Sequence, residues 1–308
     1  MIPTLRNRVP LKLDVGSTQM VDLAFPTSIP EITRAAPRLH TEVGRYRLRL
    51  AVSAEDREAA YKLRFRVFNI EMGEGLESSY QTGLDTDRFD DCCEHLLVED
   101  RQEGNPLRRI VGTYRMQSGE TAARNHGYYS EQEFRFGAYE PLRPEILELG
   151  RACIHLDHRT PEVLMLLWRG IAQYACEMGL RYLAGCSSIN SQNPAEGWQM
   201  YGQLSHYRVP PEFATEPTAA YACPNEPGSA AAQPATLSNN RWQAEHAALL
   251  PTPCKVPKLL KTYLAIGARI AAPPAWDRAF GTIDFLTLLD LRLLSASARN
   301  RFLAPLTQ

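Results

Sequence analysis

Charged side chains that could take part in chemistry recur in four short segments of this 308-residue chain. Carboxylates can accept protons from a reacting group, and guanidinium groups bind carboxylates through paired hydrogen bonds. The same residue types also form ion-pair networks whose role is only structural, so both interpretations stay open here. The four segments are Arg64-Phe65-Arg66-Val67-Phe68, Asp87-Arg88-Phe89-Asp90, Thr113-Tyr114-Arg115 and Glu148-Leu149-Gly150-Arg151.

Helices and strands that would position these segments can be predicted from periodicity and capping residues. Ser53 followed by Asp56 begins a helix that runs to about residue 71, in which Arg64 and Phe68 lie on one face. A second helix begins at Thr160-Pro161 and ends at Gly179. The pattern is that of an α/β or α+β sheet covered by helices. Strands are expected at 46–52, 95–98, 110–116, 147–156, 181–189 and 282–289, and a further helix at 256–270.

Composition limits the class of protein. The chain has 34 Lys and Arg against 35 Asp and Glu, and 44% of its residues are hydrophobic, as in an ordinary globular domain. A net charge of −1 gives no overall attraction to nucleic acid. No apolar run reaches the roughly 20 residues of a membrane span, and no secretory signal is expected. Seven irregularly spaced cysteines favour a reduced, cytoplasmic protein.

Proline and small polar residues divide the chain. Residues 1–44 contain five prolines and little periodicity, which predicts a weakly structured arm. Residues 45–292 are expected to form a single domain, and 293–308 a C-terminal tail. An insertion is predicted at about 190–254, with a short helix at 195–206 and a Pro-, Ala- and Ser-rich stretch at 209–240.

Taken in order, the four charged segments resemble the GNAT-fold ornithine and amino-acid N-acyltransferases, often labelled hemolysin-like, which are related to the acyl-homoserine-lactone synthases. The ornithine branch is the closer match. The lactone synthases typically carry a Trp soon after the first segment, whereas here Gly73 is followed by Glu74-Gly75-Leu76. The resemblance covers about 46–190 and 255–292 and includes Glu71-Met72-Gly73, Leu259-Leu260-Lys261, Ala275-Trp276-Asp277-Arg278 and Gly281-Thr282-Ile283-Asp284-Phe285.

The resemblance implies a GNAT-like acyltransferase fold, with a mixed central sheet whose strands splay apart and are flanked by helices. It also implies roles for the charged residues. Glu148 and Arg151 would lie on the central strand beside the thioester. The polar cluster on the side of the amine acceptor would be built from Arg64, Phe68, Asp87, Asp90 and Arg115.

Glu148 and Arg151 are three residues apart, so strict alternation would place them on opposite faces of a strand. A β-bulge near Leu149-Gly150 would bring both side chains toward one cleft. GNAT-like folds have such a bulge where the neighbouring strand splays away. The bulge would also leave a backbone N–H free to stabilise the oxyanion of a tetrahedral intermediate.

The implied reaction is aminolysis of a thioester, in which an amino acid's ammonium group must lose a proton before it attacks. Glu148 is the first candidate for the base, directly or through water, and Asp90 is the second. The structural alternative is that Glu148 only forms an ion pair with Arg151 or Arg115.

The segment that opens the second helix bears on the acyl donor. CoA-dependent members of the fold usually carry a Gly-rich pyrophosphate loop here, whereas this chain has His158-Arg159-Thr160-Pro161-Glu162. A helix start can still bind one phosphate, which favours the phosphopantetheine of acyl carrier protein over CoA. His158, Arg159 and Thr160 are the predicted contacts, and Arg169 could add positive charge. Ordinary solvated charges are the alternative.

Three further possibilities are weaker. Cys153 with His155 could act as a nucleophile, and with His158 these residues could bind a metal, but no fourth ligand has a recognised spacing, so no metal is expected. The basic helix Lys255 to Ile270 could lie on a membrane surface, although packing against the core is the simpler interpretation.

The sequence therefore predicts a cytoplasmic N-acyltransferase, in transient peripheral contact with the inner membrane, that moves a 3-hydroxyacyl chain from acyl carrier protein to the α-amine of ornithine. The product would be the lyso form of an ornithine lipid. No cofactor is expected beyond the acyl-phosphopantetheine co-substrate. The alternatives are an N-acyl amino-acid synthase for glycine or an aromatic amino acid, a lactone synthase, and a non-catalytic protein that binds acyl carrier protein.

Overall fold

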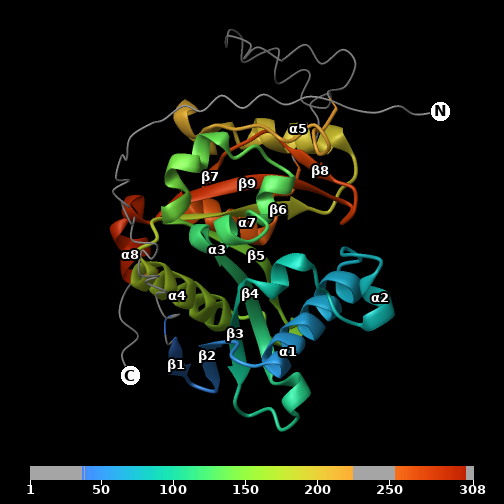
Figure 1. Ribbon diagram of the computed structural model, residues 1–308, viewed down its shortest axis with the longest axis vertical. Helices are drawn as coiled ribbons and strands as arrows, with labels where there is room; N and C mark the ends of the chain where they lie inside the picture. Colours follow the sequence, from blue (N-terminus) through green and yellow to red (C-terminus); the bar gives the residue numbers. More distant parts are fainter. Residues whose placement is uncertain (1–36, 38, 225–253, 303–308) are drawn as a thin grey trace, which may run out of the picture. The chain divides into compact units, whose positions relative to one another are not determined.

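A computed structural model describes residues 37, 39–224 and 254–302 (Figure 1). Most of the predicted N-terminal arm and residues 225–253 of the predicted insertion lie outside this part of the chain. Its strands are β1 His40–Val43, β2 Tyr46–Leu50, β3 Glu94–Asp100, β4 Ile110–Ser118, β5 Ile146–Ile154, β6 Tyr182–Ile189, β7 Arg269–Ile270, β8 Ala275–Asp277 and β9 Thr282–Asp290. Its α-helices are α1 Ala54–Phe65, α2 Ser79–Thr82, α3 Gly119–Arg124, α4 Pro161–Met178, α5 Pro194–Gln203, α7 Lys258–Ile266 and α8 Ala296–Phe302.

The strands form one mixed sheet in the order β1-β2-β3-β4-β5-β6-β9-β7, and β8 pairs with β9. Neighbouring strands are antiparallel except β5 and β6, which are parallel. In Figure 1, β3, β4 and β5 run steeply, whereas β6 and β9 cross the view. The sheet therefore consists of two parts that meet where β5 passes β6.

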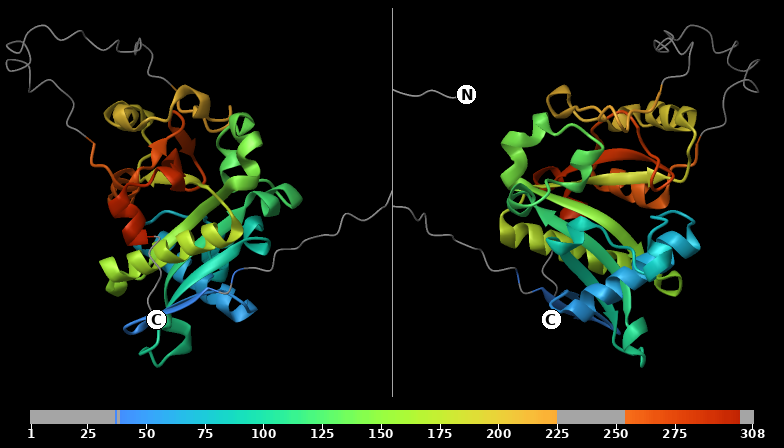
Figure 2. Two further views of the ribbon diagram at one scale, coloured as in Figure 1. Left: turned by 90° about the vertical axis from the view of Figure 1, so that its left-hand side faces the viewer. Right: turned by 45° about the vertical axis from the view of Figure 1, so that its right-hand side comes forward.

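Helices cover both faces of the first part of the sheet, as Figure 2 shows for α4 in its left view and α1 in its right view. Adjacent residues of β3 show the alternation, because Leu96 belongs to the core cluster under α4 and Leu97 to the cluster under α1. In the second part, α5 and α7 pack over β9 through residues such as Met200, Leu260 and Phe285. The predicted helix-covered sheet is confirmed.

The predicted caps are confirmed. The Ser53 hydroxyl accepts a hydrogen bond from the Asp56 backbone N–H at 3.2 Å and begins α1. Thr160 caps α4, and Gly179 ends it with φ of 71° in the left-handed region. The first helix differs from its prediction, because α1 ends at Phe65 and a π-helical segment continues over Arg66–Glu71.

Three predicted boundaries move. Residues 40–43 of the predicted arm form β1, which pairs with β2 across a turn at Gly44. Residues 209–224 of the predicted insertion are ordered, because Pro217 bridges to Phe134 and Ala222 to Ala275. The predicted tail contains α8, which packs near α4 through Ala298.

The sheet forks between β5 and β6. These strands pair only from Ile146 opposite Tyr182 to Glu148 opposite Ala184, although β5 continues to Ile154 and β6 to Ile189. The next residue of β6 is Gly185, where a Cβ atom would lie 2.2 Å from the Leu149 carbonyl oxygen. Only glycine fits at this crossing, so Gly185 lets the strands touch where they separate.

A β-bulge lies on β5 just beyond the fork. Thr113 faces Cys153 and Arg115 faces Gly150, so Tyr114 alone is opposite two residues, Arg151 and Ala152. Arg151 has φ of 50°, a left-handed conformation that is uncommon outside glycine. The predicted bulge is therefore confirmed, but it lies at Arg151-Ala152 instead of Leu149-Gly150.

Candidate active site

A cavity of about 380 Å³ lies at the fork. Tyr114 and Arg115 are neighbours on β4 and so point to opposite faces of the sheet, yet both line this cavity. The cavity therefore passes through the opening between β5 and β6. Because of the bulge, Glu148 and Arg151 both line it, as the sequence predicts.

The side of the cavity under α4 is apolar and aromatic. Trp168 and Tyr263 meet edge to face with ring centroids 5.3 Å apart, and the Tyr263 and Tyr114 hydroxyls are hydrogen-bonded to each other. Leu259 and Leu260 complete this wall. Such a surface suits a hydrocarbon chain, because burying apolar area is favourable by about 25 cal/mol per Å².

Three guanidiniums and three carboxylates form a network under the opposite side of the cavity. Arg64 donates to Asp85 at 2.7 Å and to both oxygens of Asp90 at 2.7 and 3.0 Å. Arg115 joins Asp87 at 2.7 Å and Asp90 at 3.2 Å. The network is completed by Arg151, whose Nη2 lies 3.0 Å from Asp87 Oδ2 and whose Nε lies 3.4 Å from Asp85 Oδ1.

Three guanidiniums face three carboxyl groups in this network, and the pKa values of Asp87 and Asp90 are lowered. Burial raises the pKa of Asp90, but the guanidiniums of Arg64 and Arg115 outweigh it and hold that pKa well below the ordinary range. The same competition, with Arg115 and Arg151 as partners, lowers the pKa of Asp87.

Sequence-predicted residues of this cluster fall into two sets. Arg115, Arg151 and Phe68 line the cavity, whereas Arg64, Asp87 and Asp90 lie behind its wall. Arg64 is fully buried and Asp90 is 2% exposed, so both hold their neighbours in place from behind.

Glu148 is held by the loop after Gly127. Its carboxylate accepts hydrogen bonds from the Tyr129 N–H at 2.7 Å, the Ser130 N–H at 2.8 Å and the Ser130 hydroxyl at 2.6 Å. Burial raises the pKa of Glu148, and these hydrogen bonds oppose the rise. Among the described residues Glu148 makes no ion pair with Arg151 or Arg115, although the charge of Arg115 also opposes the rise of its pKa.

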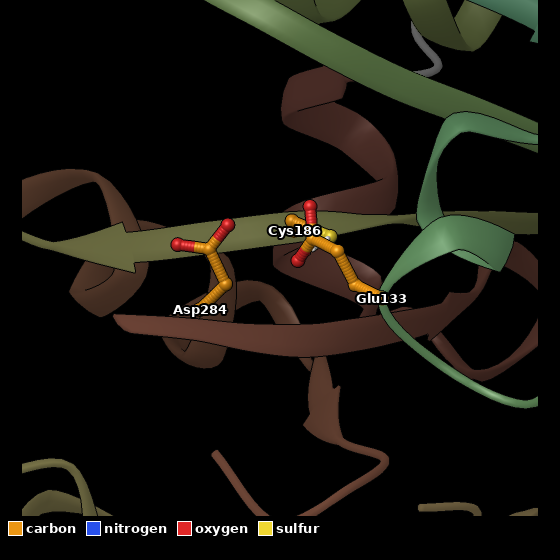
Figure 3. Close-up of side chains that lie close together, drawn as sticks. All are labelled: Glu133, Cys186 and Asp284. Atoms are coloured by element: carbon orange, nitrogen blue, oxygen red, sulfur yellow. Dashed lines mark hydrogen bonds between the residues drawn. The ribbon is translucent and has the colours of Figure 1, made fainter. Parts of the chain in front are cut away.

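The remaining wall is acidic and was not identified from the sequence. Asp277 and Asp284 line the cavity, and Glu133 lies close behind Asp284 and Cys186, as Figure 3 shows. One atom from each of Glu133, Cys186 and Asp284 lies within 4.8 Å of the others. The sequence signal was an aspartate between Ile283 and Phe285, near the start of the β-rich run Thr282–Asp290.

The residues predicted to bind the carrier protein lie at the start of α4 and outside the cavity lining. Thr160 is the helix cap, the His158 Nδ1 lies 3.1 Å from the Tyr46 hydroxyl, and Arg159 is paired with Glu71. Cys153 is buried in the core beside α1, where burial raises the pKa of its thiol, so it is not an activated nucleophile.

Comparison with known proteins agrees with this geometry. Residues 63–169 match the acetyltransferase (GNAT) domain family. The protein is thus an acyltransferase with the GNAT fold, and its forked sheet is the acyltransferase sheet that the sequence predicts.

Curated relatives match a larger part of the chain than the family model does. The chain is 34% identical over 260 residues to an L-ornithine Nα-acyltransferase of Brucella abortus, covering 82% of this chain and 87% of that protein. It is 32% identical to an enzyme of the same name from Rhizobium meliloti, covering 82% and 83%. The chain belongs to the L-ornithine Nα-acyltransferase family.

Solved structures with similar folds include the AHL synthase LasI, at 11% identity and a TM-score of 0.46, covering 85% of this chain and 97% of that one. FeeM, an N-acyl amino acid synthase from uncultured soil microbes, matches at 11% identity and a TM-score of 0.44, covering 82% and 95%.

Proposed function

We propose that this protein transfers a 3-hydroxyacyl group from acyl carrier protein to the α-amino group of L-ornithine, forming the lyso form of an ornithine lipid. The observation that carries the proposal is the cavity at the fork, which joins an aromatic wall to a polar one through the sheet. The curated relatives, which are named for ornithine, support the choice of acceptor.

The acyl chain would lie against Trp168, Tyr263 and Leu259. The phosphopantetheine arm would run along the edge of β5 beyond Glu148, where β6 no longer pairs with it. Backbone N–H groups on this edge could donate to the thioester carbonyl and stabilise the oxyanion of the tetrahedral intermediate.

Glu148 would act as the base through Ser130. The Ser130 hydroxyl lines the cavity and donates to Glu148, so it can accept a proton from the ammonium group while passing its own proton to the carboxylate. The free amine then forms the N–C bond, the C–S bond breaks, and the leaving thiolate takes up a proton. Asp90 would serve as a positioning residue through Arg115 and Arg64.

The polar cluster of the acceptor side would contact the substrate through Arg115, Arg151 and Phe68. A carboxylate of the amino acid suits the two guanidiniums, because paired N–H groups bind carboxylates well. Asp87 would fix both guanidiniums from behind through its ion pairs. Arg64 would hold Asp85 and Asp90, which pair with Arg151 and Arg115.

The carrier protein would dock at the start of α4, where Thr160 caps the helix and His158 and Arg159 lie beside it. A single phosphate at this helix start is favourable, and the acidic carrier would gain from the nearby cations. The chemistry itself needs only the acyl-phosphopantetheine as co-substrate.

A lipid-like product also supports a cytoplasmic protein that touches the inner membrane at its surface. Lys255, Lys258 and Lys261 are exposed on or next to α7 and could meet anionic lipid head groups. None of the helices in the described part of the chain is long and apolar enough to span a bilayer.

The proposal is tested by incubating the pure protein with 3-hydroxyacyl carrier protein and L-ornithine and measuring products by mass spectrometry. Acyl-ornithine linked through the α-nitrogen is expected, together with free carrier thiol. The proposal fails if glycine or an aromatic amino acid is acylated while ornithine is not, or if S-adenosylmethionine is consumed.

A further inference from the structure

Three buried carboxyl groups line or back one wall of the cavity. Glu133 is fully buried, Asp277 is 2% exposed and Asp284 is 4% exposed. They come from different parts of the chain, namely the loop before the 3₁₀ segment Gly137–Glu145, strand β8 and strand β9. Figure 3 shows the Glu133 and Asp284 side chains converging beside Cys186.

Unlike the arginine–aspartate network, this acidic wall has no compensating cation among the described residues. Asp277 accepts hydrogen bonds from the backbone N–H groups of Ala279 and Phe280. Asp284 accepts one from the Thr282 hydroxyl at 3.0 Å and is also hydrogen-bonded to the Ser188 and Glu133 side chains. Glu133 Oε2 is approached by the Cys186 thiol at 3.5 Å. Buried carboxylates without a cation are costly, so the wall suits a positively charged ligand.

One oxygen at this wall lacks a donor among the described residues, namely Oε1 of the fully buried Glu133. Buried polar atoms in native proteins nearly always have a partner. A ligand that brings N–H donors would supply the missing hydrogen bond, and a primary ammonium group has three.

The wall lies at a suitable distance from the proposed base. Ser130 Oγ and Glu133 Oε2 both lie 3.5 Å from Cys186 Sγ, so these two oxygens are no more than 7 Å apart. The two nitrogens of an extended 2,5-diamino acid are about 6 Å apart, because five bonds of about 1.5 Å join them. One molecule can therefore bring its α-nitrogen to Ser130 and its side-chain nitrogen to the acidic wall.

We infer that Asp284, backed by Glu133 and Asp277, binds the side-chain ammonium group of the acceptor and selects a diamino acid over a neutral one. This inference rests on the proposed function and assigns it specificity-determining residues. Burial, followed by the charges of Asp284 and Asp277, raises the pKa of Glu133 well above its ordinary value, and a bound cation would reverse this effect.

The test compares ornithine with norvaline, which has the same carbon chain without the side-chain amine. Rates with 3-hydroxyacyl carrier protein and binding by calorimetry are measured for wild type, Asp284→Asn and Glu133→Gln. Glu120→Gln, which removes an exposed carboxylate that pairs with Arg124, is the matched control. Activity with norvaline reports on folding of each variant.

Wild type is expected to favour ornithine over norvaline at least about 100-fold in kcat/KM, because the carboxylates stay unpaired with norvaline. Asp284→Asn should lower kcat/KM for ornithine at least about 30-fold and leave norvaline within about threefold. Glu133→Gln should act in the same direction, and Glu120→Gln should match wild type.

An unchanged ornithine-to-norvaline ratio in both variants would overturn the inference while leaving the proposed function in place. A stoichiometric divalent metal in the wild-type protein that is absent from Asp284→Asn would also overturn it, in favour of a metal site at Glu133, Cys186 and Asp284. Ornithine binding that depends on Asp284 without acyl transfer would support the inference and contradict the proposed function.

Discussion

The Ser130 hydroxyl donates a 2.6 Å hydrogen bond to the Glu148 carboxylate, and both residues line the cavity at the fork. Two backbone N–H groups hold the same carboxylate. Two backbone hydrogen bonds therefore fix the position of Glu148, and the Ser130 hydroxyl adds a third hydrogen bond at the cavity.

Ser130→Ala removes that hydroxyl and keeps the two backbone hydrogen bonds. We expect kcat to fall about 100-fold or more with a small change in KM, because proton transfer is lost while binding remains. Ser130→Thr keeps a hydroxyl and should recover much of the rate. Steady-state kinetics with ornithine measure this, and a kcat for Ser130→Ala within threefold of wild type would contradict the relay.

Arg64→Met tests the network behind the cavity. It leaves Asp85 and Asp90 buried without their main cation, so the free energy of unfolding should fall by about 3–5 kcal/mol in a denaturant titration. The exposed Arg88→Met is the control and should change stability by less than about 0.5 kcal/mol. A loss below about 1 kcal/mol in Arg64→Met would show that the network is not needed for stability.

The buried side chain of His95 should make the free energy of unfolding depend on pH. It is fully buried, and burial lowers its pKa to about 4. Below about pH 6.5 the unfolded chain binds a proton that the folded protein does not. The contribution of His95 to the free energy of unfolding is therefore fully present above that pH and is lost progressively as pH falls toward 4. The loss reaches about 3 kcal/mol. The lowered pKa values of Asp87 and Asp90 act in the same direction at still lower pH.

The measurement is the melting temperature of wild type and His95→Phe between pH 7.5 and pH 5. Carboxyl groups with raised pKa values, such as Asp284, contribute with the opposite sign, because the folded protein keeps their proton as pH rises. Comparing the two proteins removes this contribution. Parallel curves would contradict the assignment, and a flatter curve for His95→Phe would support it.

Gly185→Ala tests whether the close crossing of β5 and β6 is needed. In Gly185→Ala the new Cβ would meet the Leu149 carbonyl oxygen, so the strands must shift. We expect about 2–3 kcal/mol of lost stability and at least about a 100-fold loss of acyl transfer. Gly202→Ala, where a Cβ has open space in helix α5, should keep wild-type activity and stability. Wild-type transfer by Gly185→Ala would show that the crossing at Leu149 is not required.

Local signals in the sequence predict much of the fold. Ser53, Thr160 and Gly179 mark helix ends through capping and turn chemistry. The bulge on β5 was expected because the resemblance places Glu148 and Arg151 in one cleft, whereas their spacing alone would put them on opposite faces. The fork itself follows from the resemblance to GNAT proteins. The bulge falls later than expected, at Arg151, which takes the left-handed conformation.

The acidic wall could not be predicted in the same way. Glu133 lies in the polar stretch Glu131-Gln132-Glu133, which resembles a solvent-exposed turn. Its burial depends on β9, which is about 150 residues further along the chain. Only the tertiary arrangement brings Glu133 to Asp284, and no residue pattern within either segment predicts this contact.

The passage of the cavity through the sheet has a kinetic consequence. The aromatic and the acidic walls lie on opposite faces, so the proposed donor and acceptor would not have to compete for one entrance. Both can be held at once, and the acyl group can move directly between them without an acylated form of the protein. Double-reciprocal plots of initial velocity should then intersect, as they do for an enzyme that forms a ternary complex. A double-displacement enzyme would give parallel lines.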